Sequence, residues 1–195
     1  MKKILKLIIL SLFVILLVII SNFIKNSIII NNINIRADEI FSANNLYIKV
    51  ETKQNSEKII LNEIYCKENI ILIKTYENNV LKTNDWKDTY TGKTKSYMYL
   101  SDQIIETDSF NDELLKTIKG TTNLDKSVFC FIQKSDNYYV FDENNVFNKY
   151  YNIDTYTLEK MDNIENSIET SYTFKFNTVT DSDVEMPSEN KSIEI

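Results

Sequence analysis

The sequence contains no histidine and only two cysteines. General bases, metal ligands and catalytic triads that depend on an imidazole are therefore excluded within the chain. Cys66 and Cys130 lie on separate strand-like runs, so they cannot form a structural zinc site by themselves. Carboxylates are abundant, but the pattern brings no acid, base and pocket together. We therefore expect neither an enzyme nor a site for a metal or cofactor.

The same two cysteines would permit one disulfide in an oxidising compartment. Both lie in apolar runs, however, and a domain with many aromatic residues does not need a disulfide for its stability. We expect Cys66 and Cys130 to be buried free thiols, which behave as small hydrophobic side chains. A disulfide between them is the alternative.

Arginine is also scarce, since Arg36 is the only one in the chain. The chain has a net charge of −6, and its first 25 residues carry four lysines and no acid, which leaves −10 for the rest. Nucleic-acid binding depends on lysine and arginine neutralising phosphates. Because the domain has a net negative charge, we expect no nucleic-acid partner. Close binding of the domain to anionic lipid headgroups is disfavoured for the same reason.

A long apolar run near the start of the chain is its dominant feature. Residues 4–24 are almost entirely Ile, Leu, Val and Phe, and about 20 such residues span a bilayer as a helix. No small-residue cleavage site follows, which favours an uncleaved signal anchor over a cleaved signal peptide. Lys2, Lys3 and Lys6 precede or interrupt the run, and such basic residues stay in the cytoplasm. We expect a single-pass protein of the cell membrane with its C-terminal domain outside the cytoplasm; secretion after cleavage is the alternative.

The remainder of the chain has the length of one domain. We expect a transmembrane helix over residues 1–25, a short tether or a continuation of that helix over 26–31, a single domain over 32–187 and a flexible acidic tail over 188–195. With two glycines and one proline, the turns must come from Asn, Asp and Ser, which tolerate left-handed backbone.

Side-chain periodicity predicts two helices and about ten strands in this domain. A helical stripe over residues 32–44 includes Ile33 and Ala37, and a second helix over 109–120 begins with a capping box and ends at Gly120. Short alternating runs bounded by Asn-containing turns indicate an antiparallel meander. The prediction is an α+β fold: an N-terminal transmembrane helix and one highly curved antiparallel sheet, an open barrel, with two packing helices.

Aromatic residues supply the candidate ligand site. They alternate with polar residues in three strands and could line one concave face, with a rim position near a strand end; a filled core is the other interpretation. The candidates are Tyr97, Tyr99, Phe129, Phe131, Tyr172, Phe174, Phe176 and Trp86.

The order of these elements resembles the extracytoplasmic carrier family of LolA, LppX and RseB. The residues that carry the resemblance are YNIDTYTLEK at 151–160, which is similar to the family's strand and following turn, and the last strand with its TDSDVEMP extension at 172–187. The resemblance covers residues 32–187 and implies an open antiparallel barrel with helices as a lid, as in members that hold lipid or lipoprotein acyl chains or sense a membrane-associated partner. The terminal segment resembles that of Gram-positive members, which implies a membrane-anchored, Gram-positive type. The chain departs from the family by lacking a lipobox cysteine and by staying anchored, which argues against a freely diffusing shuttle.

Two functions remain open from the sequence. The first is a membrane-anchored, non-catalytic binding domain for an apolar ligand, a lipid or acyl chain. The second is a structural or regulatory protein with a filled core that contacts a cell-envelope partner through a strand edge or its acidic surface.

Overall fold

The structure is a computed structural model, and it describes residues 2–41, 44–54, 58–107, 110–122, 124, 132–143, 147–165 and 167–186. Phe129, Cys130 and Phe131 lie outside these ranges, as does the expected tail at 188–195.

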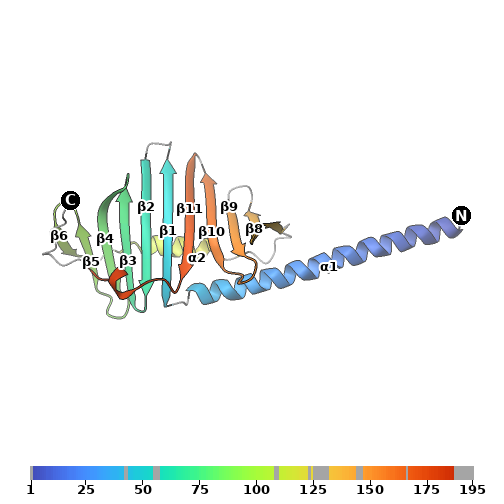
Figure 1. Ribbon diagram of the computed structural model, residues 1–195, viewed down its shortest axis with the longest axis horizontal. Helices are drawn as coiled ribbons and strands as arrows, with labels where there is room; N and C mark the ends of the chain where they lie inside the picture. The colour runs from blue at the N-terminus through green and yellow to red at the C-terminus, as the bar shows by residue number, and fades with distance from the viewer. Residues whose placement is uncertain are drawn as a thin grey trace.

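A single helix, α1 (Lys2–Phe41), joins the apolar run to the domain. It contains neither glycine nor proline, the two residues that most readily interrupt a helix. Residues 26–31, where a tether or a continuation was expected, are helical, and so is the stripe that includes Ile33 and Ala37. Half of α1 projects from the domain (Figure 1). Among the described residues, α1 is the one helix long and apolar enough to cross a membrane, and its most apolar window has no buried residue.

Eleven antiparallel strands form one sheet, which confirms the predicted α+β class with about ten strands expected. Its order is β6-β5-β4-β3-β2-β1-β11-β10-β9-β8-β7, so that β1 and β11, the first and last strands of the chain, are neighbours at the centre. Because β6 and β7 lie at opposite ends, the sheet is open. The strands are β1 (Asn45–Gln54), β2 (Lys58–Lys67), β3 (Ile70–Glu77), β4 (Val80–Asp88), β5 (Thr94–Met98), β6 (Gln103–Glu106), β7 (Gln133–Ser135), β8 (Tyr138–Glu143), β9 (Phe147–Asn152), β10 (Leu158–Glu165) and β11 (Ile168–Phe176).

Helix α2 (Asp112–Thr122) lies between β6 and β7 in the chain and differs from its prediction at both ends. Its N-terminus is capped by Asn111, whose Oδ1 accepts the N–H of Leu114 at 3.2 Å. Ser109, the expected start of a capping box, is outside the described residues. The helix also continues through Gly120, because this glycine does not have the positive φ of a helix-ending residue.

Both helices pack on one side of the sheet, which we call the helix-facing side (Figure 1). Ile29 and Ile33 of α1 and Ile118 of α2 join one hydrophobic core with residues from the strands. The strand residues of this core are Leu46, Ile48, Val50, Ile64, Ile73, Phe141, Tyr151, Leu158, Met161, Tyr172 and Phe174. The sheet is therefore stabilised mainly by apolar burial on this side.

We call the opposite side of the sheet the open face. At one end of the strands it is crossed by the C-terminal segment, including the short 3-10 helix η1 (Asp181–Asp183) (Figure 1). The Asn45 side chain holds this segment by donating to the Val179 carbonyl at 2.8 Å and accepting the Val179 N–H at 2.9 Å. The ammonium of Lys67 lies 2.5 Å from Asp181 Oδ1. Neither of the two described α-helices covers the rest of this face (Figure 1).

Candidate functional site

The aromatic candidates on the last strand belong to the core. Tyr172, Phe174 and Phe176 of β11 lie opposite Val50, Ile48 and Leu46 of β1, so they point to the helix-facing side. Tyr172 and Phe174 are 8% and 3% exposed, and the half-buried Phe176 packs against the same core. These rings therefore contact the side chains that helices α1 and α2 cover.

The structure places the other described candidates on the open face. Trp86 of β4 pairs with Leu72, which pairs with Tyr65, which pairs with Tyr47, the neighbour of the inward-facing Ile48. Tyr97 of β5 pairs with Asn84, two residues before Trp86, and so shares this face. The expectation that all these rings line one cavity is therefore not met by the described residues, because the sheet separates the two groups.

A buried asparagine binds the hydroxyl of Tyr99 on the open face. The Asn84 Nδ2 donates to the Tyr99 hydroxyl at 3.0 Å, although Asn84 is only 3% exposed. Its Oδ1 has no hydrogen-bond partner among the described residues. The Tyr97 and Tyr99 rings meet edge to face with centroids 4.6 Å apart, and the Tyr97 hydroxyl donates to Asp102. Tyr97 and Tyr99 thus form one contact pair, as their spacing in the sequence predicted, but away from Tyr172.

A second tyrosine cluster on the open face was not recognised in the sequence. The hydroxyls of Tyr47, Tyr65 and Tyr76 donate to the carboxylate of Glu63 at 2.9, 3.2 and 3.1 Å. These residues come from the adjacent strands β1, β2 and β3. The sequence pattern that could have revealed this cluster is alternation along the strands. Each tyrosine lies on the face opposite to the isoleucines that point into the core. We call these four residues the Glu63 cluster.

Burial and the Glu63 carboxylate keep these phenols protonated. Burial, followed by the nearby negative charge of Glu63, raises the pKa of Tyr76 to about 12. Burial raises the pKa of Tyr47 and of Tyr65 well above the ordinary value as well, with Glu63 as the next cause. The three hydroxyls therefore remain hydrogen-bond donors to Glu63 at neutral pH. The Glu63 cluster therefore consists of one carboxylate that accepts hydrogen bonds from three tyrosine side chains.

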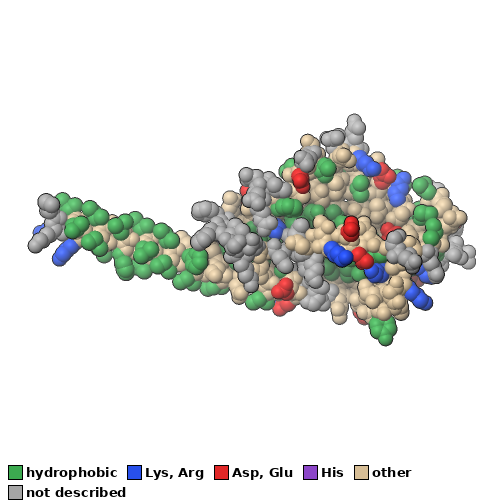
Figure 2. Space-filling model, turned by 180° about the vertical axis from the view of Figure 1, so that it is seen from behind, with side chains coloured by type: hydrophobic (Ala, Val, Ile, Leu, Met, Phe, Trp, Pro, Cys, Tyr) green, Lys and Arg blue, Asp and Glu red, His purple; other side chains and the backbone are tan. Residues whose placement is uncertain are grey.

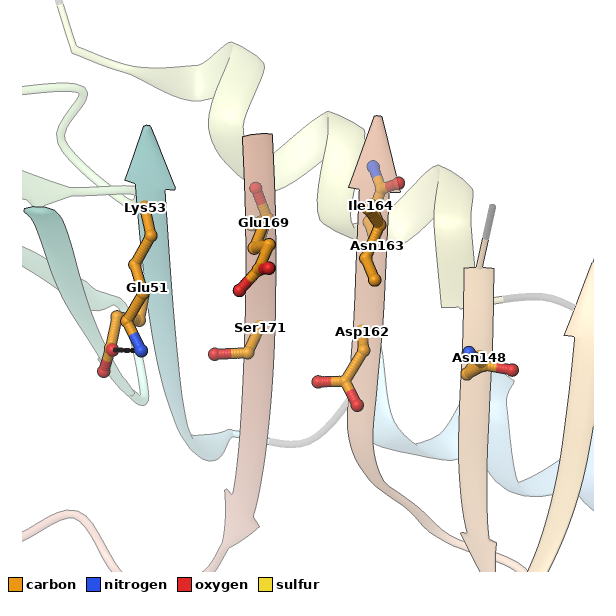
Figure 3. A pocket seen from close by; sticks show the side chains of 9 residues that line it. Glu51, Lys53, Asn148, Asp162, Asn163, Ile164, Glu169 and Ser171 are labelled. Atoms are coloured by element: carbon orange, nitrogen blue, oxygen red, sulfur yellow. Dashed lines mark ion pairs between the residues drawn. The ribbon is translucent and has the colours of Figure 1, made fainter. Parts of the chain in front are cut away.

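A cavity of about 300 Å³ lies on another part of the open face, where β1, β11, β10 and β9 are neighbours (Figure 3). Its charged groups are mostly paired: Glu51 lies 3.0 Å from Lys53 and 3.2 Å from Lys49, and these lysines lower the pKa of Glu51. This cavity is polar, in contrast to the apolar site expected from the sequence. Its walls are Glu51, Lys53, Asn148, Asp162, Asn163, Ile164, Glu169, Thr170 and Ser171.

On the helix-facing side, helix α2 covers the apolar surface with few residues. Ile118 is fully buried, whereas Leu114 and Leu115 are half-buried against the core. Lys87 of β4 holds the start of this helix through Asp112, and its ammonium lies 5.2 Å from the centre of the Phe110 ring. The arrangement can hold an apolar molecule only if α2 shifts or shares the core surface with it.

This chain is similar to known proteins only at the level of solved structures. No protein-family model matches the chain, and no curated protein matches it. An uncharacterized conserved protein from Thermus thermophilus is similar over 82% of this chain and 94% of that chain, with 9% identity and a TM-score of 0.46. A LolA superfamily protein from Nitrosomonas europaea is similar over 80% of this chain and 97% of that chain, with 9% identity and a TM-score of 0.35.

Proposed function

We propose that this chain is a membrane-anchored, non-catalytic binding domain of the bacterial cell envelope, which holds an apolar ligand such as an acyl chain between its sheet and helix α2. The observation that carries the proposal is the course of α1 (Lys2–Phe41). Its first part exposes apolar side chains all around, and its last turns bury Ile29, Ile33 and Ala37. A helix exposed in this way is stable in a bilayer and not in water.

The sign of the flanking charges supports an extracytoplasmic domain. Lys2 and Lys3 precede the span, whereas the domain beyond it has a net charge of −10. Protease protection in intact cells tests this: added protease should remove the domain while the first residues stay protected. Protection of residues 44–186 from external protease would place the domain in the cytoplasm and contradict the proposal.

The ligand part of the proposal is supported by the chemistry of the helix-facing side. The sheet there is mostly apolar from Ile73 to Phe141, with Lys149 of β9 as a buried charged residue next to Phe141 and Met161, and α2 contributes one fully buried residue, Ile118. An acyl chain is the class of ligand that matches such a surface, since it needs no polar partner. Native mass spectrometry after gentle detergent extraction tests this directly. A co-purifying lipid that is lost in an Ile118→Asp variant is the expected result, and a ligand-free protein in every extraction condition would contradict it.

A second candidate is a protein that contacts a cell-envelope partner through its open face. The Glu63 cluster favours it, because half-buried tyrosines are enriched where proteins meet. Crosslinking in cells from a photoreactive residue at Tyr65 would then capture one defined protein. The same residue at Val80, which is exposed at the start of strand β4, serves as the control and should capture none.

A further inference from the structure

Helix α1 carries the apolar run directly into the core of the domain. Ile24, the last residue of the run, is exposed, whereas Ile29 is 5% exposed and belongs to the core. Five residues of α-helix rise by about 7.5 Å. The headgroup layer on each side of the hydrocarbon core has a depth of about 5–8 Å. The first core contact of the domain therefore lies at the outer boundary of that layer.

The length of the run agrees with this placement. Residues 4–24 lie in one unbroken helix, and 21 residues rise by about 31 Å, close to the ~30 Å of a hydrocarbon core. Lys3 and Lys25 then lie in the two headgroup layers, where lysine is favoured. The register of the span is thus determined by its own ends.

The end of the sheet formed by β8 and β7 is nearest to the projecting half of α1. Figure 1 shows that this half leaves the domain beyond β8, while β5 and β6 lie at the far end, and Figure 2 shows that the projecting part carries mostly hydrophobic side chains. The strands run across the helix axis (Figure 1). With strands about 4.8 Å apart, β6 lies roughly 48 Å from β7 as measured along the sheet, and so well away from the bilayer.

We propose that the β7–β8 edge of the sheet rests on the headgroups of the bilayer, so that the lipid surface itself is a binding partner of the domain. This rests on the membrane anchor proposed above. Strand β7 (Gln133–Ser135) ends the sheet, and no described strand pairs with its outer side. Exposed strand edges are normally covered, and the headgroup layer covers this one.

The charges at this edge indicate which headgroups it fits. Lys25 and Lys134 are described on this side, together with Asp136 and Asp154 in adjacent turns and Asp142 and Glu143 at the end of β8, so acidic groups outnumber basic ones and attract the cationic part of a headgroup. Zwitterionic headgroups match such an edge. Anionic headgroups do not, because the domain behind the edge has a net charge of −10.

Depth-dependent quenching in the full-length protein tests the proposal. Single cysteines at Asn137, in the β7–β8 turn, and at Leu100, in the β5–β6 turn, would carry a fluorophore in a background with Cys66→Ala and Cys130→Ala. Leu100 is 85% exposed and Asn137 is also exposed, so both sites accept a label. The protein is reconstituted into phosphatidylcholine nanodiscs that contain headgroup-nitroxide lipid. We expect several-fold stronger quenching at Asn137 than at Leu100.

Two further variants separate this inference from the anchor. A label at Ser21, within the span, reports insertion: quenching at Ser21 without preferential quenching at Asn137 overturns the edge contact and leaves the anchor intact. No quenching at Ser21 overturns both. A Gly-Gly-Ser insertion after Lys25 uncouples span and domain, and it should reduce quenching at Asn137 while quenching at Ser21 persists. Unchanged quenching at Asn137 after the insertion would also contradict the proposal, because the rigid helix would then not position the edge.

Discussion

The ammonium nitrogen of Lys87 on β4 lies 2.8 Å from each carboxylate oxygen of Asp112, the first residue of α2. The pair ties the sheet to the N-terminus of the short helix that covers it, where a carboxylate also interacts favourably with the helix dipole. Lys87 is 22% exposed and Asp112 47%, so water screens the pair and its contribution stays within about 1 kcal/mol.

Replacement of Lys87 by Met should therefore loosen α2 without unfolding the sheet. The apolar stem is retained, but the charge that holds Asp112 is lost. Hydrogen exchange followed by mass spectrometry should show faster exchange over residues 112–118 and unchanged exchange in β1 and β11. Lys134→Met, at the exposed strand β7, is the matched control and should leave α2 unchanged. Uniformly faster exchange across the sheet would contradict a local role.

Truncation of Ile118 should have a much larger effect on stability. Ile118 is fully buried, and Ile118→Ala should lower the free energy of unfolding by about 2–4 kcal/mol, because transfer and cavity terms add. The single tryptophan, Trp86, reports unfolding by fluorescence in a urea titration of the detergent-solubilised full chain. Val80→Ala is the control, since Val80 is 55% exposed, and its cost should stay within about 0.5 kcal/mol. Equal costs for the two variants would show that α2 does not belong to the cooperative core.

The Glu63 cluster should make the protein sensitive to alkali. The folded-state pKa of Tyr76 is raised to about 12, above its ordinary value of 10.0, so the unfolded chain loses this proton first. Stability from this group is complete below pH 10 and falls as the pH rises towards 12; Tyr47 and Tyr65 act in the same direction. Urea titrations between pH 8 and 12 measure the fall.

Glu63→Gln distinguishes the cause of this sensitivity. The neutral amide removes the negative charge next to the phenols, so their pKa values should decrease, while burial, the largest cause, keeps them raised. Absorbance of tyrosinate at alkaline pH would record a titration that begins earlier than in the unmodified protein. Glu68→Gln, in the exposed β2–β3 turn, should leave the titration unchanged. A titration unaffected by Glu63→Gln would exclude the carboxylate as a cause.

Cys66 should react slowly with thiol reagents while the protein is folded. Its thiol is free, and burial raises its pKa to about 11, so very little thiolate exists at pH 8. In a Cys130→Ser background, iodoacetamide labelling should proceed only after denaturant is added. Asn79→Cys in the exposed β3–β4 turn provides a rapidly labelled control. Rapid labelling of Cys66 in the native protein would contradict this burial.

The strand pattern of the domain could be predicted because it is local. Alternation in runs such as Leu46, Ile48 and Val50 reports which side chains share one face of a strand, and the eleven observed strands follow these runs. The long apolar helix at the start of the chain was equally predictable, since residues 4–24 need only length and composition. The C-terminal end of α2 was harder to predict from the sequence, because a glycine such as Gly120 can lie either at a helix end or inside a helix.

The candidate site depended on non-local information. Tyr97 and Tyr172 both alternate with polar residues, but alternation does not specify on which side of the sheet each set lies. The pairing of Tyr97 with Asn84 and of Tyr172 with Val50 decides this, and it places the two rings on opposite faces. The Glu63 cluster was not predicted for the same reason, because its tyrosines come from three strands.

The sequence by itself determined a long apolar helix, an acidic domain and an antiparallel α+β fold, since each follows from composition or from the period of one segment. Only the tertiary structure decided that the apolar helix continues into the core without a break, and that the tyrosines of the Glu63 cluster gather on the open face. The continuous helix is stabilised because Ile29 and Ile33 are buried against the sheet. The faces were settled by strand register, because one residue of register exchanges the two sides of a strand.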